Sequence, residues 1–311
     1  MNDRESLPQL SGSTFITDGG METTLIFHVG LELPHFASFV LLDDERGVQS
    51  LTNYYMQYIE IARKQGVGII LDTPTWRANP DWGSRLGYSP DALVNINRRG
   101  VALLEAFRSD VDGKPPLVIS GCVGPRGDGY RADELMTAAE AQEYHSPQIA
   151  TFGKASADMI SALTMTYANE AVGIVKAAEE AAIPAAVSFT LETDGRLPSG
   201  QSLRDAIEEV DAQTAGAAAY FMINCVHPTH FADAFRDGGA WIDRIRGLRA
   251  NASAKSHAEL DEAVELDEGD PIELARQYRD LSALLPNLTV VGGCCGTDHR
   301  HVAAICTAWT E

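Results

Sequence analysis

The sequence is short of positive charge, of cysteine and of long apolar runs. It has 24 Lys and Arg residues against 44 Asp and Glu residues, and this formal net charge of −20 argues against nucleic acid or an anionic membrane as a partner. No apolar run approaches the roughly 20 residues of a membrane span, and residues 1–6 lack the apolar core of a targeting signal. Five cysteines without a secretory signal do not indicate a disulfide framework. We therefore expect a protein of the reducing cytoplasm.

The sequence also lacks the glycine-rich motif that binds dinucleotide cofactors. No GxGxxG follows the first apolar run, which argues against an open, doubly wound sheet. Instead, apolar runs alternate with helical patterns, and the predicted strands are residues 15–18, 68–72, 117–120, 159–163, 185–189, 219–223, 245–249 and 288–291. Eight β-then-α units in 311 residues predict an α/β fold, a (β/α)8 TIM barrel in which residues 1–311 form a single domain.

Helical patterns fill the intervals between these strands. They cover residues 51–65, 90–107, 132–155, 169–182 and 203–214, and a helix candidate follows each of the last three strands. Ser89 and Pro90 offer an N-cap and a proline in the first helical turn. We interpret the acidic segment 258–270 as a surface excursion without a binding role.

Cysteines occur where two of the predicted strands end. Cys294 and Cys295 follow the run 288–291 between glycine pairs, and Cys225 follows the run 219–223. Because the carboxyl ends of barrel strands meet at one mouth, the three thiols are expected to converge there. Three thiolates suit Zn²⁺ and leave one tetrahedral position open for a substrate thiol, which would ionise on binding and then attack an activated methyl group.

Two other interpretations of these cysteines remain open at this stage. His227 would close the site as Cys3His, which gives a structural metal without catalysis. Alternatively, the cysteines are core residues that hold no metal, as we expect for Cys122 and Cys306, although Cys122 also lies at a strand end.

Four segments resemble one known family, the homocysteine S-methyltransferases, which include the betaine-, S-methylmethionine- and selenocysteine-linked enzymes. The similarity extends from about Thr14 to Thr307, and its most specific element is a Gly-Gly-Cys-Cys-Gly pentapeptide paired with an upstream Asn-Cys. The four segments are Asp18-Gly19-Gly20-Met21, residues 121–125, Asn224-Cys225 and residues 292–297.

The resemblance implies a (β/α)8 barrel in which Cys225, Cys294 and Cys295 bind the zinc that activates the acceptor thiol. Asp18 would contact the amino group of the acceptor, with Gly19 and Gly20 making room for it. The implied reaction moves a methyl group from a small sulfonium or ammonium donor to a thiol, homocysteine giving methionine, as in methionine biosynthesis. The expected partners are thus a small thiol and a methyl donor, and a homo-oligomer is compatible with the exposed helices of a barrel.

One departure from the family bears on the acceptor. Where the family has a Glu-Thr pair after the fourth strand, this chain has Leu163 and Thr164, so the carboxylate that holds the amino group is missing. Glu22 stands in the first βα loop, where the family has a small residue, and we hypothesise that it supplies that carboxylate. If it does not, the acceptor is a different thiol or selenol without an amino group, or the protein is a non-catalytic zinc or redox barrel.

Further candidates surround the predicted mouth. Thr73 and Thr164 are predicted to contact substrate, and Asn224 to contact substrate or to orient Cys225 through a hydrogen bond. Trp76 and Trp82 could receive a methylated cationic donor by cation–π contact, or they anchor their loop.

Overall fold

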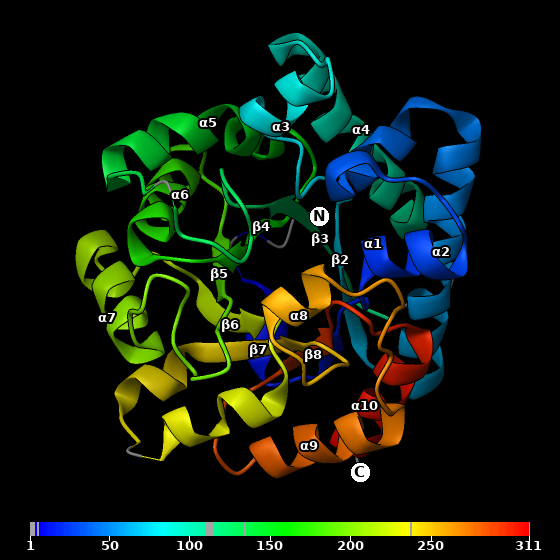
Figure 1. Cartoon of the computed structure of the whole chain (residues 1–311). Coiled ribbons are helices and arrows are strands. Elements are labelled where there is room, and N and C mark those ends of the chain that lie inside the picture. The colour runs from blue at the N-terminus through cyan, green and yellow to red at the C-terminus, as the bar shows by residue number, and fades with distance from the viewer. Residues whose placement is uncertain (1–3, 5, 110–114, 134, 237, 311) are drawn as a thin grey trace.

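Eight parallel strands close into a barrel, and helices surround it (Figure 1). The computed structural model describes residue 4 and residues 6–109, 115–133, 135–236 and 238–310. The strands are β1 (Phe15–Ile16), β2 (Gly68–Asp72), β3 (Leu117–Val123), β4 (Met159–Met165), β5 (Ala185–Phe189), β6 (Tyr220–Asn224), β7 (Ile245–Ala250) and β8 (Val290–Gly293). Each strand pairs with its neighbour in sequence, and β1 pairs with β8 through Phe15 and Val290. The predicted TIM barrel is confirmed.

The helices follow the predicted order. They are α1 (Met21–Thr23), α2 (Glu45–Gln65), α3 (Pro80–Arg85), α4 (Pro90–Ser109), α5 (Ala138–Lys154), α6 (Ala168–Glu180), α7 (Leu203–Thr214), α8 (His257–Asp261), α9 (Pro271–Leu281) and α10 (His299–Thr310). The predicted cap of α4 is present, because the Ser89 hydroxyl accepts a hydrogen bond from Ala92 N. None of the helices in the described part of the chain is both long and apolar enough to cross a bilayer.

Three predicted helices differ from the structure. The helix expected at residues 51–65 begins already at Glu45, where the Asp44 side chain accepts from Gly47 N. The helix expected from residue 132 begins only at Ala138, where Thr137 and Glu140 form a capping box. After β6 the chain forms three short 3-10 helices, Pro228–His230, Ala232–Phe235 and Ala240–Arg244, instead of an α-helix. Pro228 begins the first of them, and Gly238 and Gly239 adopt positive φ before the last. These residues interrupt regular α-helical geometry.

The barrel packs on both faces of its strands. Along β2, Ile70 joins a small cluster inside the barrel, whereas Ile69 and Leu71 join the larger core beneath the helices. Leu7 also joins the inner cluster, and Gln9 approaches Met159 and Tyr220 at the first residues of β4 and β6. The N-terminal segment thus closes the barrel at the amino ends of the strands, and the pocket lies at the opposite end.

Candidate metal centre and substrate pocket

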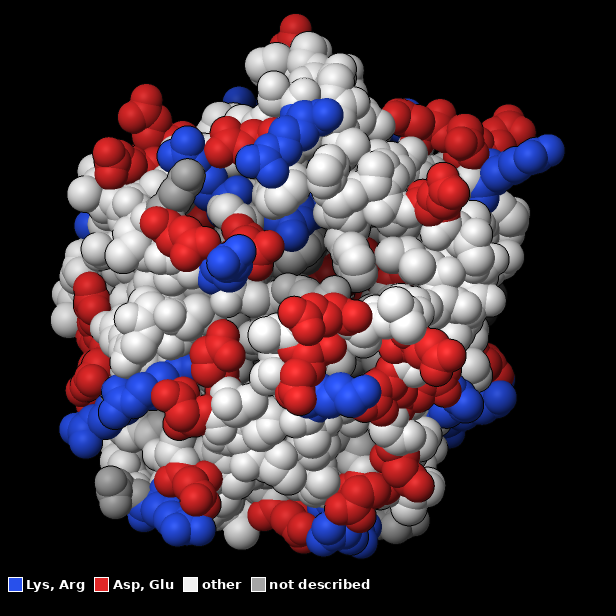
Figure 2. Space-filling model, in the orientation of Figure 1, with Lys and Arg blue, Asp and Glu red and all other residues white. Residues whose placement is uncertain are grey.

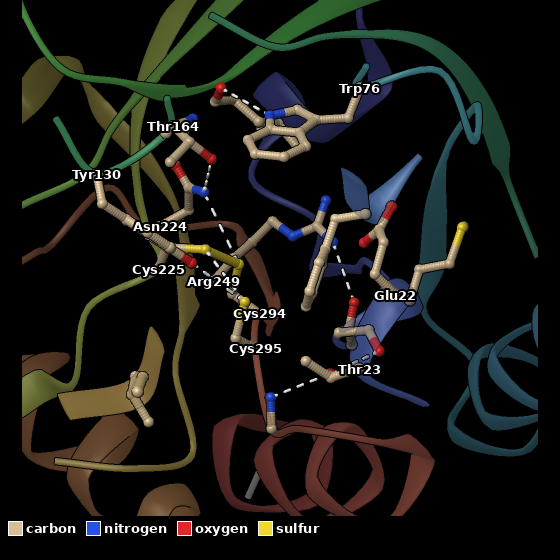
Figure 3. Close-up of a pocket in the computed structure, with 18 of the residues that line it drawn as sticks. Glu22, Thr23, Trp76, Tyr130, Thr164, Asn224, Cys225, Arg249, Cys294 and Cys295 are labelled. Carbon is tan, nitrogen blue, oxygen red and sulfur yellow. Dashed lines mark hydrogen bonds between the residues drawn. A yellow bond between two sulfur atoms is a disulfide. The ribbon is translucent and has the colours of Figure 1, made fainter. Parts of the chain in front are cut away.

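The three predicted cysteine ligands meet at the mouth of the barrel (Figure 3). Their sulfur atoms all lie within 4.8 Å of one another, and the Sγ atoms of Cys225 and Cys295 are 3.8 Å apart. A tetrahedral ion with metal–sulfur bonds of about 2.3 Å separates its sulfur ligands by about 3.8 Å. The donor set therefore fits a soft divalent cation such as Zn²⁺.

Cys225 and Cys294 are joined as a disulfide in this structure, with their Cα atoms 5.3 Å apart. The absence of a disulfide framework, predicted from five cysteines without a secretory signal, thus does not hold for this pair. The bond follows from the fold, because the strand ends bring the two Cα atoms into the range in which a disulfide forms. Since a metal binds thiolates, the pair must be reduced before the three sulfurs can act as ligands.

Backbone geometry fixes the cysteine loops. Cys225 has a φ of 56°, which turns its side chain out of the line of β6, and its N–H donates to the carbonyl of Arg249. After β8, the Thr297 hydroxyl donates to the carbonyl of Cys294 at 2.7 Å. A Cβ atom at Gly293 would lie 2.0 Å from that hydroxyl, so this close approach requires glycine.

Asn224 joins three strand ends beside the sulfurs. Its Oδ1 accepts from Thr164 N at 3.0 Å and from Ser188 Oγ at 2.6 Å, while its Nδ2 donates to Thr164 Oγ1 at 2.9 Å. The same Nδ2 points to Cys294 Sγ at 3.8 Å (Figure 3). Asn224 therefore positions Thr164, whose φ is 66°, and contacts a sulfur of the cluster.

A buried ion triad, which sequence reasoning missed, stands next to the cysteines. Arg249 at the end of β7 is 5% exposed and pairs with Asp18 and, at 2.6 Å, with Asp72. Its Nε also donates to the carbonyl of Gly293 at 3.1 Å. A charged residue near the carboxyl end of a predicted barrel strand was the available signal, since such ends face the mouth.

The triad changes the expected role of Asp18. One oxygen accepts from Arg249 and the other from the Tyr54 hydroxyl, so Asp18 is also part of the barrel's internal bonding. Burial raises the pKa of Asp18 to about 6, against the opposing attraction of Arg249. Burial disfavours the charged form of Arg249, yet Asp18 and Asp72 together raise its pKa above the ordinary value.

Glu22 lies in the first turn of α1 and lines the same pocket as the sulfurs. Its Oε1 accepts from the Ser38 hydroxyl at 2.7 Å, and burial raises its pKa above the ordinary 4.5. Figure 3 shows Glu22 across the pocket from Asn224 and Tyr130. The first βα loop thus offers a carboxylate to whatever occupies the pocket, while Leu163 offers none.

The pocket is a cavity of about 470 Å³ bounded by the strand ends. In the space-filling view its mouth is a hollow with acidic and basic side chains at the rim (Figure 2). Every residue predicted from the sequence to bind metal or substrate lines it: Asp18, Gly19, Gly20, Glu22, Thr73, Thr164, Asn224, Cys225, Cys294 and Cys295. Thr73 is held by hydrogen bonds to Thr75 and Cys122 N.

The acidic segment 258–270, predicted as a surface excursion, also forms part of the pocket wall. Leu260, Ala263 and residues 265–267 line the cavity, and α8 lies in front of β7 and β8 in Figure 1. His257 in α8 contacts the Cys225 carbonyl through Nε2 at 2.6 Å and stacks on Tyr130. These contacts tie the segment to the cysteine loop, which its acidic composition did not indicate.

Two weaker hypotheses do not fit the geometry. The Arg77 guanidinium lies over the rings of both Trp76 and Trp82, at 4.2 and 3.8 Å, so the chain's own cation occupies faces proposed for a cationic donor. His227 caps the helix Pro228–His230 and, among the described residues, does not join the cysteine group. The closed Cys3His site therefore gains no support.

The barrel carries a thiol cluster and a pocket at its mouth, and comparisons identify its family. The model of the homocysteine S-methyltransferase family matches residues 15–309. The chain belongs to this family and is a methyltransferase.

Relatives and solved structures agree with this assignment. The chain is 24% identical over 327 residues to homocysteine S-methyltransferase 1 of Arabidopsis thaliana, covering 97% of this chain and 95% of the relative. It is 23% identical to the protein of that name from Brassica oleracea var. italica, with the same coverage. The fold is similar to that of the homocysteine methyltransferase MmuM of Escherichia coli. Its metallated form gives a TM-score of 0.71 at 20% identity, covering 95% of this chain and 96% of that one.

Proposed function

We propose that this protein is a zinc-dependent S-methyltransferase that moves a methyl group from a small sulfonium or ammonium donor to homocysteine, which yields methionine. The observation that carries the proposal is the convergence of Cys225, Cys294 and Cys295 within 4.8 Å in the pocket at the mouth of the barrel. All-sulfur coordination suits thiol chemistry better than water activation, for which His and carboxylate ligands prevail. Thiol chemistry of this kind is consistent with the reducing cytoplasm.

Cys225, Cys294 and Cys295 would hold the metal after reduction, and Asn224 keeps their loops in place through its bonds to β4 and β5. Bound zinc would lower the pKa of an acceptor thiol, so that the thiol releases its proton to solvent and reacts as a thiolate at neutral pH. The thiolate sulfur attacks the methyl carbon of the donor and forms a carbon–sulfur bond. The bond from that methyl group to the donor heteroatom breaks, and its electron pair remains on the donor.

Glu22 is the candidate to hold the ammonium group of homocysteine, since Leu163 cannot and Asp18 is bound by Arg249 and Tyr54. The absence of a carboxylate at Leu163 favours a second candidate, an acceptor thiol or selenol without an amino group.

The test begins with metal analysis of reduced protein supplied with zinc, for which we expect one ion per chain. A screen of donors against acceptors, read by mass spectrometry, then identifies the substrates. Methyl transfer to homocysteine supports the first candidate, and transfer only to thiols without an amino group supports the second. Protein that binds zinc but methylates no thiol contradicts the proposal. Pairing of exposed barrel helices into a homo-oligomer stays a prediction.

A further inference from the structure

Arg77 is a buried cation in the pocket without an anionic partner. It lies between β2 and α3, is 8% exposed, and lines the cavity together with the cysteines and Glu22. The rings of Trp76 and Trp82 hold its guanidinium by cation–π contact, at 4.2 and 3.8 Å. Stacking against two rings restricts the arginine side chain to one place in the wall.

The hydrogen bonds of Arg77 are incomplete. Nη1 donates to the carbonyl of Gly127 at 2.9 Å, while Nε is buried and has no partner. Across the described residues, no carboxylate oxygen comes within ion-pair distance of the guanidinium. Arg249 in the same pocket is different, since it pairs with two carboxylates.

The groups that face Arg77 leave it charged. Burial lowers its pKa to about 10, opposed by Asp128, Glu22 and Tyr130 and reinforced by Arg85, so it is cationic at neutral pH. Glu22 is near enough to affect this pKa, but its Oε1 is bonded to Ser38. A buried, unpaired charge is costly unless an opposite charge joins it. This cost points to an anionic ligand.

We propose that Arg77 binds the carboxylate of a substrate, at the guanidinium edge that faces the cavity. The inference rests on the proposed function, because it concerns the same pocket. Among the charged residues that line the pocket, Glu22 offers an anion and Arg77 a cation, and these two match the ammonium and carboxylate groups of an α-amino acid. An amino acid carboxylate would form a charge-assisted hydrogen bond with the guanidinium. The carboxylate belongs either to the thiol acceptor or to the methyl donor.

Binding can be measured without turnover. Isothermal calorimetry on the full-length, metal-free, reduced protein compares L-methionine with 3-(methylthio)propylamine, which differs only by lacking the carboxylate. The variant is Arg77→Gln. Its matched control is Arg85→Gln, because Arg85 also lies over the Trp82 ring, at 4.5 Å, but is exposed and does not line the cavity.

We expect Arg77→Gln to weaken methionine binding by about ten- to a hundredfold, the loss of one hydrogen bond to a charged group, and to leave the amine unchanged. Arg85→Gln should bind both probes as the parent does. An equal loss of affinity for both probes in a folded Arg77→Gln protein would overturn the inference. Unchanged methionine binding, or a parent protein that binds methionine no better than the amine, would overturn it as well.

Kinetic measurements then show whether the carboxylate belongs to the acceptor or to the donor. A raised KM for homocysteine but not for 3-aminopropanethiol places it on the acceptor, and a raised KM for S-methylmethionine but not for its decarboxylated analogue places it on the donor. If methionine binds through Arg77 but no methyl transfer occurs, only the proposed function fails. If methyl transfer occurs and Arg77→Gln changes neither KM nor binding, only this inference fails.

Discussion

The proposal that the acceptor carries an amino group depends on Glu22. It is the carboxylate of the first βα loop, and burial raises its pKa. Leu163, which also lines the pocket, offers no carboxylate there. If Glu22 holds the ammonium group, it must be ionised when the acceptor binds. The acceptor affinity should therefore depend on pH as well as on the side chain.

We predict that Glu22→Gln raises the KM for homocysteine by one to two orders of magnitude, since one hydrogen bond to a charged group contributes about 1.5–3 kcal/mol. The KM for propanethiol, which has no amino group, should not change. In the parent, homocysteine affinity should fall as the pH drops through the raised pKa of Glu22, because the neutral carboxyl cannot pair with an ammonium. In the variant, the affinity for homocysteine should not fall over this pH range. An unchanged KM for homocysteine in Glu22→Gln would show that Glu22 does not bind the ammonium group.

The five cysteines should differ in reactivity. Burial raises the pKa of Cys306 to about 11 and that of Cys122 well above its ordinary range, so neither forms much thiolate at neutral pH. In reduced, zinc-free protein, iodoacetamide should modify Cys225, Cys294 and Cys295 first, as read by peptide mass spectrometry. Zinc should protect these three, and a chelator should remove the protection. Zinc-independent labelling of the cluster would contradict the proposed ligand set.

At the scale of elements, the site consists of the residues that follow the strands. β4, β5 and β6 end beside one another, and Asn224 connects them through Thr164 and Ser188. These bonds hold Thr164 at a positive φ, which a β-branched residue rarely adopts. Removing Asn224 should therefore affect both the backbone and the sulfur cluster.

Asn224→Ala should lower the free energy of unfolding by about 1–3 kcal/mol, because it leaves the buried N–H of Thr164 unpaired. Zinc affinity should fall by about 10- to 100-fold, as for other residues that support metal ligands. Denaturant unfolding of the zinc-free protein and competition with a chromogenic chelator measure the two effects. Asn53→Ala, on the exposed side of α2, is the control and should change neither.

The elements could be predicted from the sequence because each carries its own periodicity and end signals. The bounds of β2 and β5 and of α7 agree with the predicted ranges, and all three have clear turn or cap residues beside them. The end of β8 and the Asn224-Cys225 pair were equally clear, since glycine and cysteine follow apolar runs there.

Other parts of the site depend on contacts between distant segments. The pairing of Arg249 with Asp18 and Asp72 joins residues 231 and 177 positions apart, and no local pattern encodes it. The covering role of the segment around α8 depends on His257 reaching the Cys225 carbonyl. The position of Arg77 between two tryptophans likewise appears only when the loop after β2 is folded.

For the molecule as a whole, Arg249 links the first two strands of the closed barrel to the last strand. Its guanidinium bonds to Asp72 at the end of β2, to Asp18 after β1 and to Gly293 in β8, so it spans the seam at which β1 meets β8. Loss of this cation would leave two buried carboxylates close together with no opposite charge. Such a break is far more costly than the loss of an exposed ion pair.

Arg249→Gln should destabilise the protein by about 3–5 kcal/mol, measured by denaturant unfolding of the reduced, zinc-free chain. The triple variant Asp18→Asn, Asp72→Asn, Arg249→Gln should regain part of that loss, because it removes the unpaired charges. Arg204→Gln, which breaks an exposed pair with Glu208 on α7, is the control and should cost less than about 1 kcal/mol. Equal effects of Arg249→Gln and Arg204→Gln would contradict the role of the triad.

The central claim is that three sulfurs hold one zinc ion and leave one position for the acceptor thiol. X-ray absorption spectroscopy of reduced, zinc-loaded protein tests it most directly. We predict three sulfur neighbours at about 2.3 Å with one lighter atom, and four sulfur neighbours after homocysteine is added. Zinc with fewer than three sulfur ligands, or a spectrum that no thiol changes, would contradict the account.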